Sequence, residues 1–252
     1  MTNKGIIKKI VEAADIGPSD AVLEIGPGTG ALTEEIAKRA GKLIAVEKDK
    51  RLVEVLKERF KDFKNVEIIE GDALKFEFQN PDFEYKVVAN IPYYITSYII
   101  RKFLEAQNKP KEMVLMVQKE VAKRICAKPP DMNLLAVSVQ FYGTGKILFN
   151  VSKNNFYPVP KVDSSLIKIT PETTGLNNNS DFVKTFFKIV KAGFSSPRKQ
   201  ILNNFCRGLK TSKKSASLWL EKNGISPQRR AQTLSMEEWI KLASSCGLLE
   251  CL

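Results

Sequence analysis

The sequence contains no histidine, and its four cysteines form no Cys-x-x-Cys pair within 252 residues. Structural zinc sites, haem ligation by histidine and general base catalysis by histidine are therefore not expected. Scattered cysteines of this kind are typical of reduced thiols. We expect a cytoplasmic protein that binds no metal.

Long apolar runs are also missing. No stretch reaches the roughly 18 apolar residues that span a bilayer. The opening residues MTNKGIIKKI lack the apolar core of a secretory signal. We expect a monomer without a membrane segment, and the chain length suits one large domain or one large and one small domain.

Acidic residues are few relative to basic ones, and the net charge is +12. Residues 181–252 contain 13 Lys and Arg against 5 Asp and Glu, so +8 of the excess lies in this last part. A basic segment of this kind favours a polyanionic partner such as a nucleic acid. Lysine-rich helices that are merely well solvated are the alternative interpretation.

Short apolar runs alternate with helical periodicity over about the first 170 residues, which is typical of a parallel α/β sheet. The predicted strands lie at residues 21–26, 42–47, 66–71, 85–90 and 112–118, with late antiparallel strands at 145–151 and 164–171. The predicted helices lie at residues 5–14, 31–40, 50–60, 95–105 and 120–127. The pattern of residues 133–143 fits either a helix or a strand.

A polar, asparagine-rich stretch interrupts this alternation and predicts a linker at residues 173–180. Helical periodicity follows at residues 182–194, 198–209, 214–224 and 236–247. The sequence therefore predicts a large α/β domain at residues 1–172 and a small, basic, all-helical domain at residues 181–252.

A glycine-rich turn separates the first predicted strand from the next helix. In LEIGPGTGALT, Gly26, Gly28 and Gly30 allow tight backbone angles and close approach of a ligand to the backbone. The turn has no P-loop lysine, and its spacing differs from the dinucleotide-binding G-x-G-x-x-G. A neutral or cationic nucleoside suits it better than a pyrophosphate, which favours S-adenosylmethionine.

Acidic residues at the ends of the first three predicted strands complete this candidate site. Glu47 is placed to bind both ribose hydroxyls, and Asp72 to accept a hydrogen bond from an adenine amino group. A plain strand-end carboxylate and a helix cap are the respective alternatives. Glu24 either ties down the turn or contacts the amino group of the ligand. The neighbouring residues expected to border the same site are Lys48, Ala73 and Asn90.

The segment NIPYY follows the fourth predicted strand directly. An amide, a proline and two aromatic side chains at this point, from Asn90 to Tyr94, suit a flat ligand with polar edges, such as a nucleobase. A strand-end cap is the alternative for Asn90, whereas Tyr94 is expected to pack rather than to take part in catalysis.

Taken together, NIPYYIT, LEIGPGTGALT, GDAL, VQKEVAKRI and FYPVPKVDSSL resemble motifs of the ribosomal RNA adenine N6-dimethyltransferases. The resemblance runs from about Gly5 to Leu234. GFSSPRKQILNNF and ISPQRRAQTLSMEEWIKLA resemble the branch that modifies small-subunit RNA. Members usually begin with a longer segment, carrying a Gln-Asn-Phe/Leu element, that folds over the cofactor. This sequence begins roughly where that segment would end.

The resemblance implies a Rossmann-like, S-adenosylmethionine-dependent methyltransferase domain followed by a small all-helical domain. It implies transfer of two methyl groups to each of two adjacent adenosines near the 3′ end of small-subunit ribosomal RNA. The substrate would be that RNA or an immature small subunit, and S-adenosylhomocysteine the product.

The same resemblance assigns the catalytic residues. Asn90 and the Ile91 carbonyl would accept hydrogen bonds from the adenine amino group, with Pro92 helping to set the peptide direction. Tyr93 and Phe156 would stack on the two faces of the base, although Phe156 could instead belong to the core. Lys161 and Asp163 are expected to form a structural pair that orders their loop.

Two other functions share these motifs. One is methylation of large-subunit RNA, as in the antibiotic-resistance branch. The other is a non-catalytic assembly or transcription factor that uses its basic surface. The candidates for RNA contacts in the helical domain are Arg198, Lys199, Arg207, Lys210, Lys213 and Lys214.

Overall fold

The computed structural model of the chain describes residues 3–77, 84–172, 175 and 179–247. The chain forms two compact units. The first comprises Met1–Lys123 and Gly143–Pro171, and the second comprises Arg124–Tyr142 and Glu172–Leu252. This division differs from the expected boundary at residue 172, because residues 124–142 group with the C-terminal residues.

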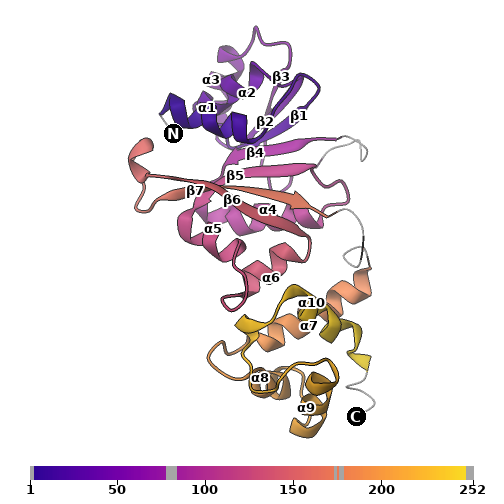
Figure 1. Ribbon diagram of the computed structural model, residues 1–252. Coiled ribbons are helices and arrows are strands. Elements are labelled where there is room, and N and C mark those ends of the chain that lie inside the picture. The colour runs from indigo at the N-terminus through magenta and orange to yellow at the C-terminus, as the bar shows by residue number, and fades with distance from the viewer. Residues whose placement is uncertain (1–2, 78–83, 173–174, 176–178, 248–252) are drawn as a thin grey trace. The chain divides into compact units, whose positions relative to one another are not determined.

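A mixed sheet forms the centre of the first unit (Figure 1). Within the described residues it has seven strands in the order β3-β2-β1-β4-β5-β7-β6. The first five strands are parallel, β7 is antiparallel to β5, and β6 is antiparallel to β7. The predicted fold class is therefore confirmed, including the late antiparallel strands. The strands are β1 (Ala21–Ile25), β2 (Lys42–Glu47), β3 (Val66–Glu70), β4 (Lys86–Asn90), β5 (Glu112–Gln118), β6 (Gly143–Val151) and β7 (Ser164–Pro171).

Helices flank most of the parallel strands in the chain, close to where the apolar periodicity predicts them. Asn3 and Asp49 cap the first and third of these helices with their side chains. The segment after β4 starts with a 3-10 turn at Tyr93–Ile95, so the following helix begins at Thr96. The helices of this region are α1 (Lys4–Ala13), α2 (Ala31–Ala37), α3 (Lys50–Arg59), α4 (Thr96–Glu105) and α5 (Lys119–Ile125).

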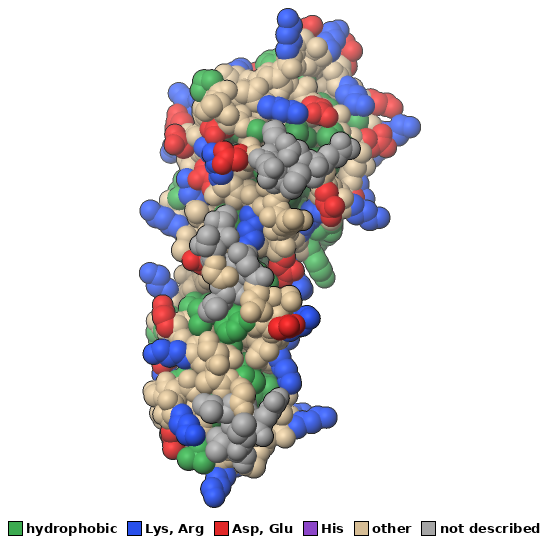
Figure 2. All heavy atoms as spheres, turned by 90° about the vertical axis from the view of Figure 1, so that its right-hand side faces the viewer, with side chains coloured by type: hydrophobic (Ala, Val, Ile, Leu, Met, Phe, Trp, Pro, Cys, Tyr) green, Lys and Arg blue, Asp and Glu red, His purple; other side chains and the backbone are tan. Residues whose placement is uncertain are grey.

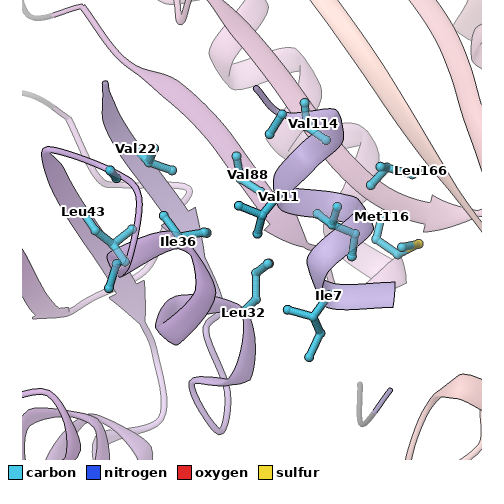
Figure 3. Packing of buried hydrophobic residues seen from close by; sticks show 14 of the residues in the cluster. Ile7, Val11, Val22, Leu32, Ile36, Leu43, Val88, Val114, Met116 and Leu166 are labelled. Atoms are coloured by element: carbon cyan, nitrogen blue, oxygen red, sulfur yellow. The ribbon is translucent and has the colours of Figure 1, made fainter. Parts of the chain in front are cut away.

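An apolar cluster fills the space between the sheet and the helices α1 and α2 (Figure 3). Val11 of α1 lies beside Val88 of β4, and Ile7 of α1 and Val114 of β5 belong to the same cluster. Successive residues of a strand point to opposite faces of the sheet. Each strand therefore contributes side chains to this cluster on one face and to the packing on the other face. Each fully buried aliphatic side chain contributes about 1.5–3 kcal/mol, so the cluster stabilises the packing of these helices on the sheet.

An ionic cluster lies at the amino-terminal ends of β4 and β5. The Lys86 Nζ donates to Asp20 at 3.1 Å and to the backbone carbonyls of Ala14 and Asp15. It also lies 3.8 Å from Glu112 of β5. The Lys86 side chain is 12% exposed, so these contacts replace most of its hydration.

The second unit consists of helices packed through aromatic side chains. The ambiguous segment at residues 133–143 forms a helix, capped by the Asn133 side chain. Phe141, just after this helix, stacks on Phe186 with 4.1 Å between ring centroids, which explains why residues 124–142 group with this unit. The helices are α6 (Leu134–Gln140), α7 (Ser180–Gly193), α8 (Ile201–Gly208), α9 (Lys213–Lys222) and α10 (Met236–Ser244).

The predicted linker at residues 173–180 lies mostly outside the described residues, which include Gly175, Asn179 and Ser180 of it. Asn179 caps α7, and Ser180 is already its first residue. Among the described helices, none combines the length and the apolar character needed to cross a membrane.

Candidate active site

The predicted site residues gather where the direction of strand succession reverses in the sheet. From β1 the chain proceeds outward to β2 and β3, and β4 then pairs with the other edge of β1. Ligands of open α/β sheets bind outside the carboxyl ends of the strands at such a switch point. The glycine turn follows β1, and Asn90 ends β4, so both lie at this point.

The glycine turn needs its glycines for two different reasons. Gly26, Gly28 and Gly30 all have positive φ angles, of 65°, 59° and 80°. A Cβ on Gly30 would lie 2.8 Å from the side chains of Leu56 and Phe60, so Gly30 permits close packing. A Cβ on Gly28 would meet nothing within 4 Å, so Gly28 leaves open space against which a ligand could lie.

Glu47, at the end of β2, is tied to this turn. One carboxylate oxygen accepts a hydrogen bond from the Gly28 N–H at 3.1 Å. The other accepts from the N–H groups of Lys48 and Asp49 at 2.8 and 3.0 Å. A carboxylate offers about four acceptor positions. Glu47 therefore orders the turn and keeps acceptor capacity for a further donor.

Asp72 and Lys48 form an ion pair beside the site. The Lys48 Nζ lies 3.0 Å from one Asp72 oxygen, and the other oxygen accepts from the Leu74 N–H at 3.0 Å. The Leu74 N–H and then the Lys48 ammonium hold the pKa of Asp72 below its ordinary value. The Lys48 side chain is 77% exposed, whereas Ala73 is buried. Asp72 is thus an ionised acceptor with both oxygens engaged.

Glu24 lies beneath the turn and is buried, with 1% of its surface exposed. Desolvation raises the pKa of Glu24 to about 8, the proximity of the Glu47 carboxylate adds to the shift, and Thr33 opposes it. Its Oε2 atom has no hydrogen-bond partner among the described residues. A buried carboxyl oxygen without a partner is the kind of atom that a bound cation or donor would satisfy.

A cavity of about 280 Å³ opens beside Asn90. No side-chain hydrogen bond of Asn90 occurs within the described part of the chain, so its amide remains available to a ligand. A Cβ on Gly26 would lie 4.0 Å from Pro92, which brings the glycine turn next to this cavity. The lining residues are Asn90, Ile91, Pro92, Tyr93, Phe156, Tyr157, Pro158 and Pro160.

Two aromatic side chains of the cavity are held in place by different contacts. The Tyr93 hydroxyl forms a hydrogen bond of 2.9 Å with the buried Ser164 hydroxyl of β7. Phe156 is 8% exposed and belongs to the apolar cluster under α1, while it also lines the cavity. Phe156 is thus both a core residue and a residue that could stack on a base in the cavity. Tyr94 does not line the cavity and is 81% exposed.

A second cavity, of about 400 Å³, was not predicted from the sequence. It is lined from three segments of the first unit, and its basic residues are Lys119, Lys123, Lys153 and Lys161. The expected Lys161–Asp163 pair is not formed. Asp163 accepts a hydrogen bond from the Lys153 N–H at 3.0 Å instead, and so orders the loop through the backbone.

The six basic residues predicted to contact RNA all lie in the second unit and are exposed. The buried Asn204 amide donates to the carbonyls of Gly193 and Ser196, which fixes the segment leading to Arg198 and Lys199. Lys210 follows α8 with a φ of 54°. In the face drawn in Figure 2, basic side chains stand out along the edge of this unit with few acidic ones nearby.

The sequence model of the ribosomal RNA adenine dimethylases matches residues 1–246 of the chain. The chain belongs to this family. A ribosomal RNA small subunit methyltransferase A of Dehalococcoides mccartyi is 50% identical over 246 residues, covering 96% of this chain and 84% of that protein. The protein of the same name from Caldanaerobacter subterraneus is 44% identical, covering 98% of this chain and 94% of its own.

Solved structures of this family agree with the fold. A dimethyladenosine transferase from Plasmodium falciparum is 31% identical with a TM-score of 0.84, and the alignment covers 98% of each chain. The 23S rRNA methyltransferase ErmE is 26% identical with a TM-score of 0.78, covering 99% of each chain. The adenine dimethylase fold thus extends across both compact units.

Proposed function

We propose that the protein transfers methyl groups from S-adenosylmethionine to the N6 atoms of adenosines in small-subunit ribosomal RNA, leaving S-adenosylhomocysteine. The proposal includes two methyl groups on each of two adjacent adenosines near the 3′ end, as the family resemblance implies. The observation that carries it is the unpartnered Asn90 amide, at the cavity that adjoins the glycine turn.

The residues around the turn fit the methyl donor. Open space at Gly28 admits the cofactor against the backbone, and Glu47 retains an acceptor position for the ribose. The unpartnered oxygen of Glu24 would satisfy a cationic amino group. Asp72 would accept from the adenine amino group of the cofactor, with Lys48 and Ala73 beside it. When bound, the cofactor supplies an activated methyl group on a sulfonium.

Asn90 and Ile91 prepare the target nitrogen. The N6 lone pair of adenine is delocalised into the ring, so the free amino group is a poor nucleophile. Two oxygens, of the Asn90 side chain and of the Ile91 carbonyl, would accept its hydrogens and favour a localised lone pair. A preorganised group of this kind contributes about 3–4 kcal/mol to transition-state stabilisation.

Tyr93 and Phe156 hold the base between them. The Ser164 hydroxyl fixes the Tyr93 ring, and the apolar cluster fixes Phe156, so little ordering remains to be done on binding. Stacking on an aromatic side chain contributes about 1–3 kcal/mol per base. The target adenosine must be unpaired or flipped out to enter the cavity. The proton released by the amino group passes to water, so no dedicated base is required.

Small-subunit RNA is favoured over large-subunit RNA by the comparisons. Relatives named as small-subunit methyltransferases are up to 50% identical, whereas the 23S methyltransferase is 26% identical. The basic residues Arg198, Lys199, Arg207, Lys210, Lys213 and Lys214 would contact the phosphates, and the protein would act on ribosomal RNA in the cytoplasm.

The test is transfer of labelled methyl groups from S-adenosylmethionine to RNA. The protein is incubated with immature small subunits and, separately, with large-subunit RNA. Label in small-subunit RNA alone is expected. Label in large-subunit RNA alone would assign the resistance-type function, and label in neither would assign a non-catalytic binding role.

A further inference from the structure

The second cavity of the first unit is positioned beside the base cavity. The two share the loop at residues 152–163: Pro160 lines the base cavity and Lys161, the next residue, lines the second. Met116 of β5 pairs with Asn90 in the sheet register, and Gln118 lies two residues further along the same strand. Two residues of strand span about 7 Å. Residues that line the two cavities are therefore neighbours both in the loop and along β5.

The charge of the second cavity is unbalanced. Four lysines face two carboxylates, those of Glu120 and Asp163. One oxygen of Asp163 is engaged by the Lys153 N–H. Within the described residues, none of the four lysines lies within 4.0 Å of a carboxylate oxygen, whereas Lys38, Lys48, Lys86, Lys111 and Lys168 of the same unit all form such pairs.

The cavity is built by backbone contacts that hold its three segments together. The Lys119 N–H donates to the Asp163 carbonyl at 3.0 Å, and the Asp163 carboxylate accepts from the Lys153 N–H. Asp163 thus connects the start of α5 to both ends of the loop. The lysine side chains extend from a fixed frame, which lowers the entropy cost of gathering them around an anion.

We propose that this cavity binds the phosphodiester backbone of single-stranded RNA next to the adenosine in the base cavity. The inference rests on the proposed function, since it assumes an RNA substrate. Lysine ammonium groups are compact charges that neutralise phosphates without reading sequence. The cavity therefore positions the strand, and the base cavity selects the adenine.

The test uses a fluorescent oligouridylate, which contains no adenosine, and the full chain with Lys119→Gln, Lys153→Gln and Lys161→Gln combined. Each phosphate contact on a single strand contributes about 0.7 to the slope of log K against log salt. We expect at least about tenfold weaker binding at low salt and a slope flatter by about 2. The matched control carries Lys57→Gln, Lys61→Gln and Lys64→Gln, which are exposed and make the same charge change.

Binding of S-adenosylhomocysteine, measured by calorimetry, shows whether the triple variant is folded and is expected to be unchanged. An affinity and slope equal to those of the control variant would overturn the proposal. Inorganic phosphate that displaces the oligouridylate from wild-type protein at comparable concentration would assign a free anion site instead. Oligouridylate contains no adenosine to methylate, so its binding is measured independently of methyl transfer. The binding result therefore tests the lysine cavity even if the methyl-transfer experiment fails.

Discussion

The Glu47 carboxylate accepts a hydrogen bond of 3.1 Å from the backbone N–H of Gly28, which joins the end of β2 to the turn after β1. The contact holds Gly28 at a positive φ of 59° with open space beside it. The proposed cofactor site thus depends on an acidic side chain that orders the backbone as well as on the glycines themselves.

Replacement of Gly28 by alanine tests this open space. The methyl group clashes with nothing in the protein, so the loss of stability is limited to the left-handed backbone, about 1–2 kcal/mol. We expect binding of S-adenosylhomocysteine, measured by calorimetry, to weaken at least tenfold. Gly224→Ala is the matched control, since Gly224 has a φ of 73° and equally open surroundings. It should lose similar stability and keep wild-type affinity; equal affinities of the two variants would contradict the assignment.

Replacement of Glu24 by glutamine tests the buried carboxyl group. Its ordinary pKa of 4.5 is raised to about 8 in the folded protein, so the folded state binds the proton more tightly. The free energy of unfolding should therefore fall as the pH rises from about 4.5 to about 8, by about 2 kcal/mol between pH 6 and pH 8. Urea unfolding at these two pH values should show a smaller fall for Glu24→Gln. An unchanged fall would show that another group is responsible, and the exposed Glu67→Gln serves as control.

Replacement of Asn90 by alanine tests the acceptor for the target amino group. We expect kcat for methyl transfer to fall about 10²- to 10³-fold, in line with the loss of one preorganised polar group. The dissociation constant of S-adenosylhomocysteine should change little. The exposed Asn203→Ala provides a control with the same chemical change. Wild-type turnover of the Asn90 variant would remove this residue from the mechanism.

Replacement of Lys86 by methionine tests the ionic cluster at the far end of the strands. The change removes a donor from two backbone carbonyls and from Asp20 and removes the ion pair with Glu112, although Lys168 still pairs with Glu112 at 2.8 Å. We expect the free energy of unfolding to fall by about 2–3 kcal/mol. Lys111→Met, which removes an exposed pair with Glu84, should produce no measurable change in urea denaturation. Equal losses of unfolding free energy in both variants would mean that the buried Lys86 cluster stabilises the protein no more than an exposed ion pair.

Much of the site could be predicted because parallel strands bring their carboxyl ends together. Glu24, Glu47 and Asn90 all lie at strand ends that the apolar runs already locate. Contacts within the site could not be predicted in the same way. The hydrogen bond between Glu47 and Gly28 and the unpartnered Oε2 atom of Glu24 depend on side-chain packing, which periodicity does not encode.

The lysine cavity shows why other features remain hidden in the sequence. Lys119 and Lys161 are brought to one place by the antiparallel pairing of β5 with β7, in which Gln118 lies opposite Ser164. The chain passes through β6 before β7 pairs with β5, so the register of this pair is set by contacts distant in sequence. No local sequence pattern specifies that register. The same holds for residues 124–142, because their apolar pattern does not reveal that Phe141 stacks on Phe186.

The most direct test of the central claim is mass mapping of modified nucleosides in small-subunit RNA after reaction of immature small subunits with the protein and S-adenosylmethionine. We expect two adjacent N6,N6-dimethyladenosines, and their absence when the Asn90→Ala variant is used. Methylation on another atom or another base, or no modification of the RNA by the wild-type protein, would contradict it.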